Sequence, residues 1–332
     1  MTVAWLALQF VLCAAIILGA GVRLSRYGDI IAEKTGLGGV WIGVVLMATV
    51  TSLPELITGA SAIILVGAPE IAAGDAIGSC MFNLLILAFL DFRHPAPLSA
   101  SIHQGHVLAA GFGIVQLGLA AVVVVVGGAA PMIGWVGVHS LLFFAVYVFA
   151  MRTIFFYERR RHAQVVEALT GDVRYQDETL GRAAAMYAVF AAVLVAAAAW
   201  LPAVGERLAA ASGLSQSFVG SLFVAASTSL PEVAVSVAAA RLGAIDMAAA
   251  NLFGSNLFNI AVLGADDVFY TAGSFLGAVS EANLITLIAT MTMTAIAIIG
   301  LTYRAQRKRF RLSWDALGIV AVYVLTAFYL AG

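Results

Sequence analysis

Charged residues are scarce in this sequence of 332 residues. Asp, Glu, Lys and Arg make up only 11% of it, whereas hydrophobic residues make up 62%. Soluble domains carry roughly 25% charged residues, so this composition excludes a water-soluble fold. Cysteine is scarcer still, because Cys13 and Cys80 are the only two and both lie within apolar runs. The sequence therefore indicates neither a disulfide framework nor a clustered thiolate metal site.

Two further patterns are missing. The alternation of polar and apolar residues typical of membrane β-barrels does not occur, so helices are expected to satisfy the backbone hydrogen bonds in lipid. The motifs His-Glu-x-x-His and Gly-x-Ser-x-Gly are absent, and the Gly74-Asp75 pair has no second catalytic Asp motif to match it. These absences argue against an intramembrane enzyme.

Apolar runs recur along the whole chain, and a run of about 20 residues is long enough to cross a hydrocarbon core of about 30 Å. They predict an all-α integral membrane protein with ten transmembrane helices. Arg23 and Arg26 follow the first run and no basic residue precedes it, the reverse of a signal peptide, so we expect it to remain a helix. The predicted spans are 3–21, 38–66, 71–92, 106–126, 133–151, 183–201, 215–240, 245–270, 281–303 and 314–330.

Basic residues are distributed very unevenly among the connections between these spans. If both termini are placed outside, every Lys and Arg except Arg207 falls in a connection that faces the cytoplasm. The positive-inside rule therefore predicts a multi-pass protein of the inner (plasma) membrane with both termini extracytoplasmic. The longest connection, residues 154–182, is expected to be a cytoplasmic linker between two halves, residues 1–153 and 183–332.

Two polar segments occur twice. Met-Ala-Thr-Val-Thr-Ser-Leu-Pro-Glu at 47–55 returns as Val-Ala-Ala-Ser-Thr-Ser-Leu-Pro-Glu at 224–232, and Gly-Ser-Cys-Met-Phe-Asn at 78–83 returns as Gly-Ser-Asn-Leu-Phe-Asn at 254–259. The separations are 177 and 176 residues. Because each half holds five spans, an odd number, the second half is expected to lie upside down relative to the first. Inverted repeats of this kind are typical of alternating-access transporters.

A proline interrupts each copy of the first segment. Pro54 and Pro231 each remove a backbone hydrogen bond, to the carbonyls of Val50 and Ser227. Carbonyls freed at membrane depth are tolerated where they line a cavity or meet a ligand. Thr and Glu lie four residues apart in each copy, at 51 and 55 and again at 228 and 232, so their oxygens project from one helix face.

The following span adds a polar stripe in each half. Asp75, Ser79 and Asn83 are spaced at intervals of four, and Asn251, Ser255 and Asn259 repeat this spacing. Hard oxygen donors without His or Cys suit Ca²⁺, Mg²⁺, Mn²⁺ or Na⁺. A carboxylate at the centre of a span costs about 2.5–3.5 kcal/mol, so an intramembrane Glu indicates a functional site.

Structural roles remain open for several of these residues. Glu55 and Glu232 could be protonated acids that join helices, the threonines could bond to helix carbonyls, and the Ser and Asn residues could join neighbouring helices. We expect Gly74, Gly78 and Gly254 to serve close helix packing. Asp75 could be a ligand or part of the access path. Three acids near span ends are interpreted as solvated caps or charges at the mouth of the pathway: Asp91, Asp266 and Asp267.

The doubled Thr-Ser-Leu-Pro-Glu break, each followed by Gly-Ser-x-x-Phe-Asn, resembles the α-repeats of the cation/Ca²⁺ exchanger superfamily, which includes the sodium/calcium exchangers. The resemblance covers residues 38–92 and 214–270. It implies a cation site built from side chains of both repeats and from backbone carbonyls near Ala48 and Ala225. The implied side-chain ligands are Thr51, Ser52, Glu55, Ser79 and Asn83 together with Thr228, Ser229, Glu232, Ser255 and Asn259. Asp75, from its place on the polar stripe, is a possible additional acid.

Two departures from the family pattern bear on the counter-ion. Asn259 stands where sodium/calcium exchangers usually carry an acid, and Cys80 replaces the Asn found in the second copy. The resemblance implies an antiporter that exchanges Ca²⁺ or a similar hard divalent cation for Na⁺, with Glu55 and Glu232 shared between the exchanged ions. A H⁺-coupled antiporter and, from another class, a cation channel remain alternatives.

The remaining expectations concern partners and moving parts. We expect a monomeric functional unit in the lipid bilayer that handles inorganic cations, with no cofactor and no nucleic-acid partner. By analogy with the fold of the family, the first and sixth spans, which lack buried polar residues, are expected to slide as gates.

Overall fold

The computed structural model describes residues 3–166, 175–212 and 225–331. Almost all of this chain is helical. The first half contains α1 (Val3–Thr35), α2 (Gly39–Trp41), η1 (Ile42–Met47), α3 (Ala48–Thr51), α4 (Leu53–Ser61), η2 (Ala62–Val66), α5 (Pro69–Arg93), α6 (Leu98–Ser101), α7 (His106–Val126), η3 (Gly127–Ala129), β1 (Met132–Ile133), β2 (Val136–Gly137) and α8 (Val138–Val166). The second half contains α9 (Leu180–Ser212), α11 (Ala225–Thr228), α12 (Leu230–Arg241), α13 (Ile245–Phe269), η5 (Leu276–Ala278), α14 (Glu281–Tyr303) and α15 (Trp314–Ala331).

Helix α13 is the centre of the bundle. It packs against α5 and α12, against η1, and against α7 and α8. In its apolar stretch 94% of the residues are buried, more than in any other helix of membrane-spanning length in the described chain. A helix surrounded by protein in this way does not need to be apolar on every face, so it can carry polar residues inward.

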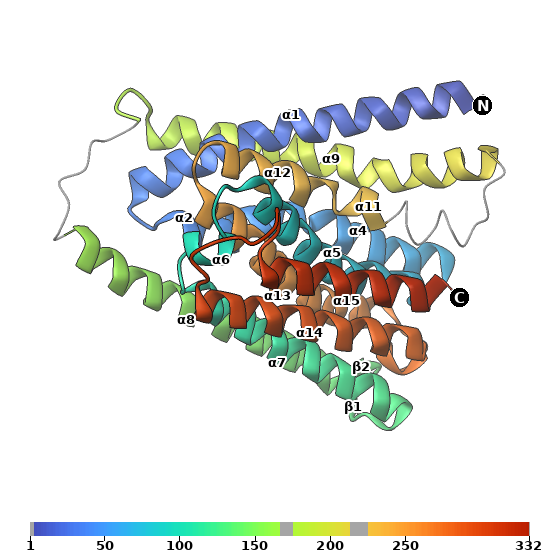
Figure 1. Ribbon diagram of the computed structural model, residues 1–332. Coiled ribbons are helices and arrows are strands. Elements are labelled where there is room, and N and C mark those ends of the chain that lie inside the picture. The colour runs from blue at the N-terminus through green and yellow to red at the C-terminus, as the bar shows by residue number, and fades with distance from the viewer. Residues whose placement is uncertain (1–2, 167–174, 213–224, 332) are drawn as a thin grey trace.

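Helices α1 and α9 form a separate layer. They run in opposite directions, side by side, along one flank of the bundle (Figure 1). Only 17% of the apolar window of α1 and 22% of that of α9 are buried. The rest of their surface is apolar and exposed, as expected for helices that face lipid.

Eight helices in the described part of the chain are long and apolar enough to cross a membrane, and a shorter apolar helix covers Trp314–Leu330. The predicted span 215–240 falls partly on residues 215–224, which lie outside the described residues, and its remainder forms α11 and α12. Helix α1 continues to Thr35, well beyond the predicted end at residue 21, and α8 continues to Val166, into the predicted linker. Hydropathy marks only the apolar part of a helix, which explains both differences.

The predicted start of the fifth span, at residue 133, is wrong. Residues Met132–Ile133 pair with Val136–Gly137 as a short antiparallel hairpin, and α8 begins at Val138. Gly134 adopts a left-handed conformation with φ of 66°, which allows the tight turn. Since the hairpin residues are apolar, composition alone did not separate them from the helix.

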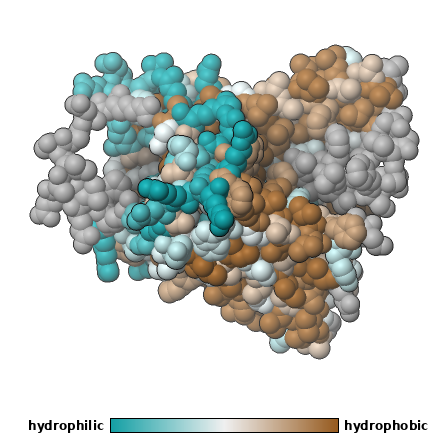
Figure 2. All heavy atoms as spheres, viewed as in Figure 1, coloured by the Kyte–Doolittle hydropathy of each residue, from teal (hydrophilic) through white to brown (hydrophobic). Residues whose placement is uncertain are grey.

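Hydrophilic residues gather at one end of the molecule, on the left in Figure 2. The connection between α14 and α15 lies at this end, and it carries the exposed side chains of Arg307, Arg309 and Arg311. The opposite end, where the described chain begins and ends, is mostly hydrophobic on this face. The basic residues are thus gathered at the end that the charge distribution predicts to face the cytoplasm.

Asp91 and Asp267 are both buried, so the prediction that they are solvated is wrong. The Asp91 carboxylate accepts hydrogen bonds from Leu98 N (2.7 Å) and from Ser313 N (2.8 Å), the residue just before α15. The Asp267 carboxylate accepts them from Phe275 N (3.3 Å) and from Gly137 N (2.7 Å), the residue just before α8. Each aspartate therefore ties its own connecting loop to the start of the last helix of the other half. Lys308 also pairs with Asp91, at 3.2 Å.

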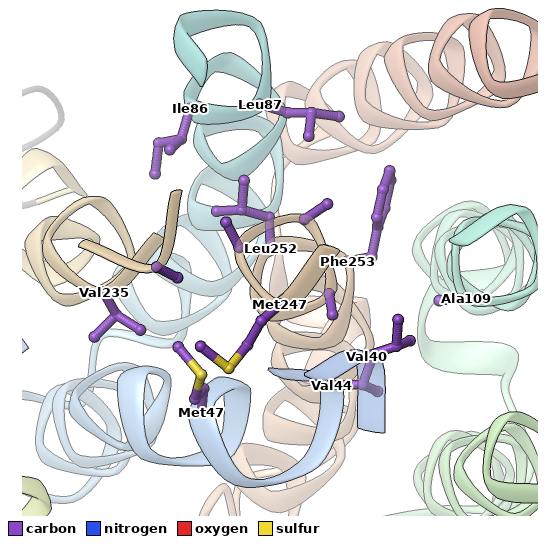
Figure 3. Packing of buried hydrophobic residues seen from close by; sticks show 14 of the residues in the cluster. Val40, Val44, Met47, Ile86, Leu87, Ala109, Val235, Met247, Leu252 and Phe253 are labelled. Atoms are coloured by element: carbon purple, nitrogen blue, oxygen red, sulfur yellow. The ribbon is translucent and has the colours of Figure 1, made fainter. Parts of the chain in front are cut away.

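Helix α13 and π-helical segment η1 cross at very short range. A Cβ atom added to Gly254 would lie 2.6 Å from Val44 O, and one added to Gly43 would lie 2.6 Å from Met247 O. Met47 and Met247 fill the space beside this crossing (Figure 3). The prediction that Gly254 serves close packing is confirmed. A Cβ atom added to Gly74 would lie 3.8 Å from Asn283 Oδ1, and one added to Gly78 would meet no described atom within 4 Å outside its own helix. The role of these two glycines in packing stays a prediction.

Replacing Gly254 with Ala is expected to lower the thermal stability of the detergent-solubilised protein. The added methyl group meets backbone atoms of Val44, which cannot turn aside, and overpacking of this kind costs about 1–3 kcal/mol. Thermal unfolding monitored by tryptophan fluorescence measures the effect. The control is Gly111→Ala in α7, where no described atom lies within 4 Å. An unfolding midpoint for Gly254→Ala at or above that of the control would contradict the prediction.

Candidate cation site

Both Thr-Ser-Leu-Pro-Glu segments interrupt their helices at the serine. Ser52 (φ −96°, ψ 4°) separates α3 from α4, and Ser229 (φ −83°, ψ 3°) separates α11 from α12. Each proline is then the second residue of the new helix, where its missing N–H costs nothing. Glu55 and Glu232 consequently lie in the first turn of a half-helix, where the backbone N–H groups and the helix dipole favour negative charge.

The two glutamates are buried and lie close to each other. Glu55 is 1% exposed and Glu232 is fully buried. Ser79 Oγ donates to Glu55 Oε1 at 3.3 Å, and Ser255 Oγ donates to Glu232 Oε1 at 3.4 Å. The carboxylates are near enough for the charge of one to act on the other. The structure therefore brings together the two acids that the repeats predict to meet.

The hydroxyl groups of each broken helix reach across to the other half. Ser52 Oγ donates to Glu232 Oε1 at 3.2 Å, and Thr51 Oγ1 lies 3.2 Å from Ser255 Oγ. In the opposite direction, Ser229 Oγ donates to Ser79 Oγ at 3.1 Å and Thr228 Oγ1 donates to Asp75 Oδ1 at 2.9 Å. Since all of these residues are buried, the two halves share one polar cluster.

The two asparagines are buried in the same cluster but differ in their partners. Asn83 Nδ2 donates to Asn256 Oδ1 at 3.0 Å. In the repeat, Asn259 corresponds to Asn83 and Cys80 corresponds to Asn256, so Cys80 is the residue expected to bond to Asn259. Cys80 lies beside Asn259, but its thiol donates to Asn256 O, at 3.6 Å. Neither amide atom of Asn259 makes a hydrogen bond of normal geometry to a described residue. The substitution of Cys for Asn in the first repeat thus leaves one amide of the second repeat without a partner.

The predicted backbone ligands are only partly described. The carbonyl of Ala48, a buried residue, accepts from Ser52 N at 3.1 Å and from Thr51 Oγ1 at 3.3 Å. It would have to share its oxygen with these donors in order to bind a cation. Ala225 is the first residue of α11, and its place on the broken helix matches that of Ala48.

Several buried oxygens in this cluster have no hydrogen-bond donor among the described residues. They are Glu55 Oε2, Glu232 Oε2, Asp75 Oδ2, Asn83 Oδ1 and Asn259 Oδ1. None of the three acids forms an ion pair with a described Lys, Arg or His. Carboxylate and amide oxygens are ligands that hard cations prefer. The arrangement can therefore accept a cation directly.

Three further residues join the cluster: Asn251, which the sequence predicted as part of the polar stripe but not as a ligand, and Ser236 and Asn256, which were not assigned from the sequence. Thr51 Oγ1 donates to Asn251 Oδ1 at 3.4 Å, and Asn251 Nδ2 donates to Ser236 Oγ at 3.1 Å. Asn256, which accepts from Asn83, is the third. The i+4 stripe contains Asn251, and the doubled Gly-Ser-x-x-Phe-Asn motif contains Asn256, so both could have been found from the repeats.

The chain matches the family described as "Sodium/calcium exchanger protein" over residues 5–153 and 182–332. It is 29% identical over 232 residues to an uncharacterized membrane protein, MJ0091, of Methanocaldococcus jannaschii, covering 69% of this chain and 70% of that protein. It is 28% identical over 250 residues to the inner membrane protein YrbG of Escherichia coli, covering 73% and 72%. A structure of the sodium-calcium exchanger NCX_Mj soaked with Na⁺ and Sr²⁺ has the same fold, with a TM-score of 0.74 and 20% identity, covering 98% of this chain and 99% of that one.

Replacing Cys80 with Asn is expected to raise the thermal stability. The new amide gives Asn259 the partner that Asn83 already has in Asn256, and a buried hydrogen bond contributes about 1 kcal/mol. Unfolding midpoints in detergent measure the gain against Cys80→Ala, which removes the thiol without supplying an amide. A midpoint for Cys80→Asn no higher than that of Cys80→Ala would show that Asn259 has no need of this partner.

Proposed function

Because the chain belongs to the sodium/calcium exchanger protein family, whose members are membrane antiporters, we propose that it exchanges Ca²⁺, or a similar hard divalent cation, for Na⁺. The proposal depends most on one observation. Glu55 and Glu232 are buried in one polar cluster, each with an oxygen that lacks a hydrogen-bond donor among the described residues. Two buried carboxylates that lack a basic partner are strongly unfavourable unless a cation or a proton neutralises them.

The proposed ligand set combines both broken helices with α5 and α13. The two carboxylates carry a charge of −2 when ionised, which one divalent cation or two monovalent cations would neutralise. Hydroxyl and amide oxygens complete the coordination that Ca²⁺ prefers, six to eight oxygens. The proposed ligands are Glu55, Thr51, Ser52, Ser79, Asn83, Glu232, Thr228, Ser229, Ser255 and Asn259, with carbonyls of Ala48 and Ala225.

We further propose that the chain spans the plasma membrane ten times, as two inverted halves, with both termini outside. The halves are residues 1–153 and 183–332, joined by the linker 154–182. Contacts that match at the repeat separation support this plan. The bonds from Ser79 to Glu55 and from Ser255 to Glu232 correspond, as do those from Ser313 to Asp91 and from Gly137 to Asp267. One chain supplies both glutamates, so a monomer suffices as the functional unit, and the ligands are the chain's own side chains, without a cofactor.

Alternating access requires that the empty site resist reorientation, because a ligand that binds two states equally drives nothing. Unneutralised carboxylates make reorientation of the empty site unfavourable. Each exchanged ion neutralises Glu55 and Glu232 when it is bound, and so allows the site to reorient. The gates would be α1 and α9, which lie as a pair outside the central bundle (Figure 1). Helix α1 does contain one buried polar residue, Ser25, which donates to Val235 O at 2.8 Å and so ties α1 to α12.

A H⁺-coupled exchange is the second candidate, favoured by the same pair of acids. Two adjacent buried carboxylates share a proton when no cation is bound, so a proton could serve as the counter-ion. Position 259 on α13 carries an amide and not a third acid. The site therefore carries less negative charge than it would with an acid at this position.

Proteoliposomes loaded with ⁴⁵Ca²⁺ distinguish these functions. We expect an imposed inward Na⁺ gradient to drive Ca²⁺ efflux, because Na⁺ replaces Ca²⁺ at the shared carboxylates. Efflux that responds to an imposed pH gradient and does not respond to a Na⁺ gradient would identify H⁺, and not Na⁺, as the counter-ion. Ca²⁺ current that needs no counter-ion would instead indicate a cation channel.

Replacing either glutamate by glutamine is expected to abolish high-affinity binding of Ca²⁺ while the protein stays folded, because the amide keeps the shape and removes the charge. Losing one buried charge partner costs about 3 kcal/mol, which corresponds to about a hundredfold in affinity. ⁴⁵Ca²⁺ binding to the purified Glu55→Gln and Glu232→Gln variants measures the loss, with the exposed Glu33→Gln as the matched control. Binding within about threefold of that control in both variants would refute the ligand assignment.

A further inference from the structure

The two halves differ at one pair of equivalent positions within the polar stripes. Asp75 in α5 corresponds to Asn251 in α13, at the repeat separation of 176 residues, and both are buried. Their threonine partners also correspond, since Thr228 donates to Asp75 and Thr51 donates to Asn251. The first half therefore places a charged group where the second half places a neutral one.

The neutral position in the second half is closed by hydrogen bonds. Asn251 Nδ2 donates to Ser236 Oγ at 3.1 Å, and Ser236 Oγ donates in turn to Ala248 O at 3.4 Å. With Thr51 on its carbonyl oxygen, the Asn251 amide has a partner for both its donor and its acceptor. Nothing in this network calls for an ion.

The equivalent place in the first half is occupied by a second acid. Gly59 stands at the position of Ser236, 177 residues earlier, and the carboxylate of Asp266 fills the space that a side chain would take. A Cβ atom on Gly59 would lie 2.6 Å from Asp266 Oδ2 and 2.7 Å from Oδ1. Asp266 itself has Leu90 as its counterpart in the first repeat. The carboxylate is therefore an addition to the repeat pattern, pressed against helix α4.

Asp266 is 0% exposed, so its interpretation as a solvated cap is wrong, whereas a charge at the mouth of the pathway stays a prediction. Both of its carboxylate oxygens, and Asp75 Oδ2, lack a hydrogen-bond partner among the described residues. The charges of Asp75 and Asp266 act on each other, and no described Lys, Arg or His forms an ion pair with either. An uncompensated buried carboxylate costs several kcal/mol, so this pair needs two positive charges. One proton shared by the two acids and one monovalent cation would supply them.

The surroundings favour a cation with one charge. The pair itself offers three free carboxylate oxygens. One turn away from Gly59, Asp75 and Asp266 lie the apolar residues Ala62, Ala72 and Leu263. Glu55 and Ser79 of the glutamate cluster lie one turn from Gly59 and Asp75 in the opposite direction along their helices. Ca²⁺ requires six to eight oxygens, more than this place offers. The donors are all oxygen, which suits a hard cation such as Na⁺.

The pair lies on one side of the Glu55–Glu232 cluster. Asp75 is one turn from Ser79 toward the start of α5, and Asp266 is two turns from Asn259 toward the end of α13. These two helix ends lie on the same side, because Glu70 near the start of α5 accepts hydrogen bonds from Ser280 and Asn283, at the start of α14, which the loop after α13 reaches. In the predicted orientation this is the extracytoplasmic side.

We propose that Asp75 and Asp266 form a second cation site, which holds one Na⁺ between the outer surface and the glutamate pair. The choice of Na⁺ rests on the proposed exchange, whereas the need for a cation comes from the buried acids themselves. An ion held here neutralises charge that would otherwise oppose the release of a cation from the glutamates outward. The site carries no counterpart in the second half, so it acts on one side of the membrane only.

Counting bound Na⁺ tests the proposal. Purified protein free of divalent cations is equilibrated with saturating ²²Na⁺, and the ions bound per chain are measured for Asp75→Asn, Asp266→Asn and the control Glu70→Gln. Asp75→Asn installs the residue that the second half carries, so the fold is retained even if Asp266→Asn proves unstable. We expect both aspartate variants to bind about one Na⁺ fewer than the wild type. Each substitution removes negative charge that holds the ion, and the single buried acid that remains is neutralised by a proton instead. The control should bind the wild-type number, since Glu70 is engaged with Ser280 and Asn283.

The outcomes separate this site from the proposed exchange. An unchanged Na⁺ count in either folded aspartate variant, or displacement of the ion by equimolar ⁸⁶Rb⁺, would overturn the assignment. ⁴⁵Ca²⁺ binding is measured in parallel and is expected to persist in Asp266→Asn, within about threefold of wild type. If Glu55→Gln and Glu232→Gln retain Ca²⁺ binding while the aspartate variants lose Na⁺, the glutamate assignment fails and the second site stands. If the glutamate variants lose Ca²⁺ binding while the Na⁺ count of the aspartate variants is unchanged, the glutamate assignment stands and the second site fails.

Discussion

The unfavourable burial of carboxylates without basic partners determines the organisation of this protein. Glu55 and Glu232 are enclosed among helices that would otherwise be apolar, and an isolated charge in such surroundings costs several kcal/mol. The interruptions at Ser52 and Ser229 place each glutamate at the start of a half-helix, where N–H groups and the helix dipole offset part of this cost. Hydroxyls from both halves offset more of it, and we propose that a bound cation offsets the remainder. On this proposal the antiporter activity of the family follows, because different ions can neutralise the carboxylates in turn.

The convergence of the polar residues could be predicted from the sequence because polar side chains are rare in an apolar chain. Thr51 and Glu55 share a helix face by spacing, as do Ser79 and Asn83, and the second copy of the pattern identified the residues that meet them. Contacts such as Ser79 with Glu55 and Thr51 with Ser255 agree with that expectation. The binding of a cation by these residues remains a prediction, since proximity alone does not establish it.

Other features were not accessible because they depend on the surroundings of a residue and not on its neighbours in the sequence. Hydropathy could not separate the hairpin at 132–137 from helix α8, since both are apolar. Position near a span end suggested solvation for Asp266 and Asp267, but the hairpin and the loop after α13 cover that end: Asp267 accepts from Gly137 and Phe275, and Asp266 is pressed against Gly59. Repeat comparison could have marked Asp266 as an addition, because Leu90 occupies the matching position.

The hydrogen bond from Ser52 in the first half to Glu232 in the second half has a consequence for biosynthesis. A ribosome that adds about 5–20 residues per second delivers residue 55 about 9 to 35 seconds before residue 232. During this interval the first half has inserted a glutamate, while the residues that will surround it on the other side are still unmade. Ser79, from the same half, is its partner in the meantime. A newly made first half should therefore be a natural substrate for insertion factors that shield polar groups from lipid until the remainder of the chain arrives.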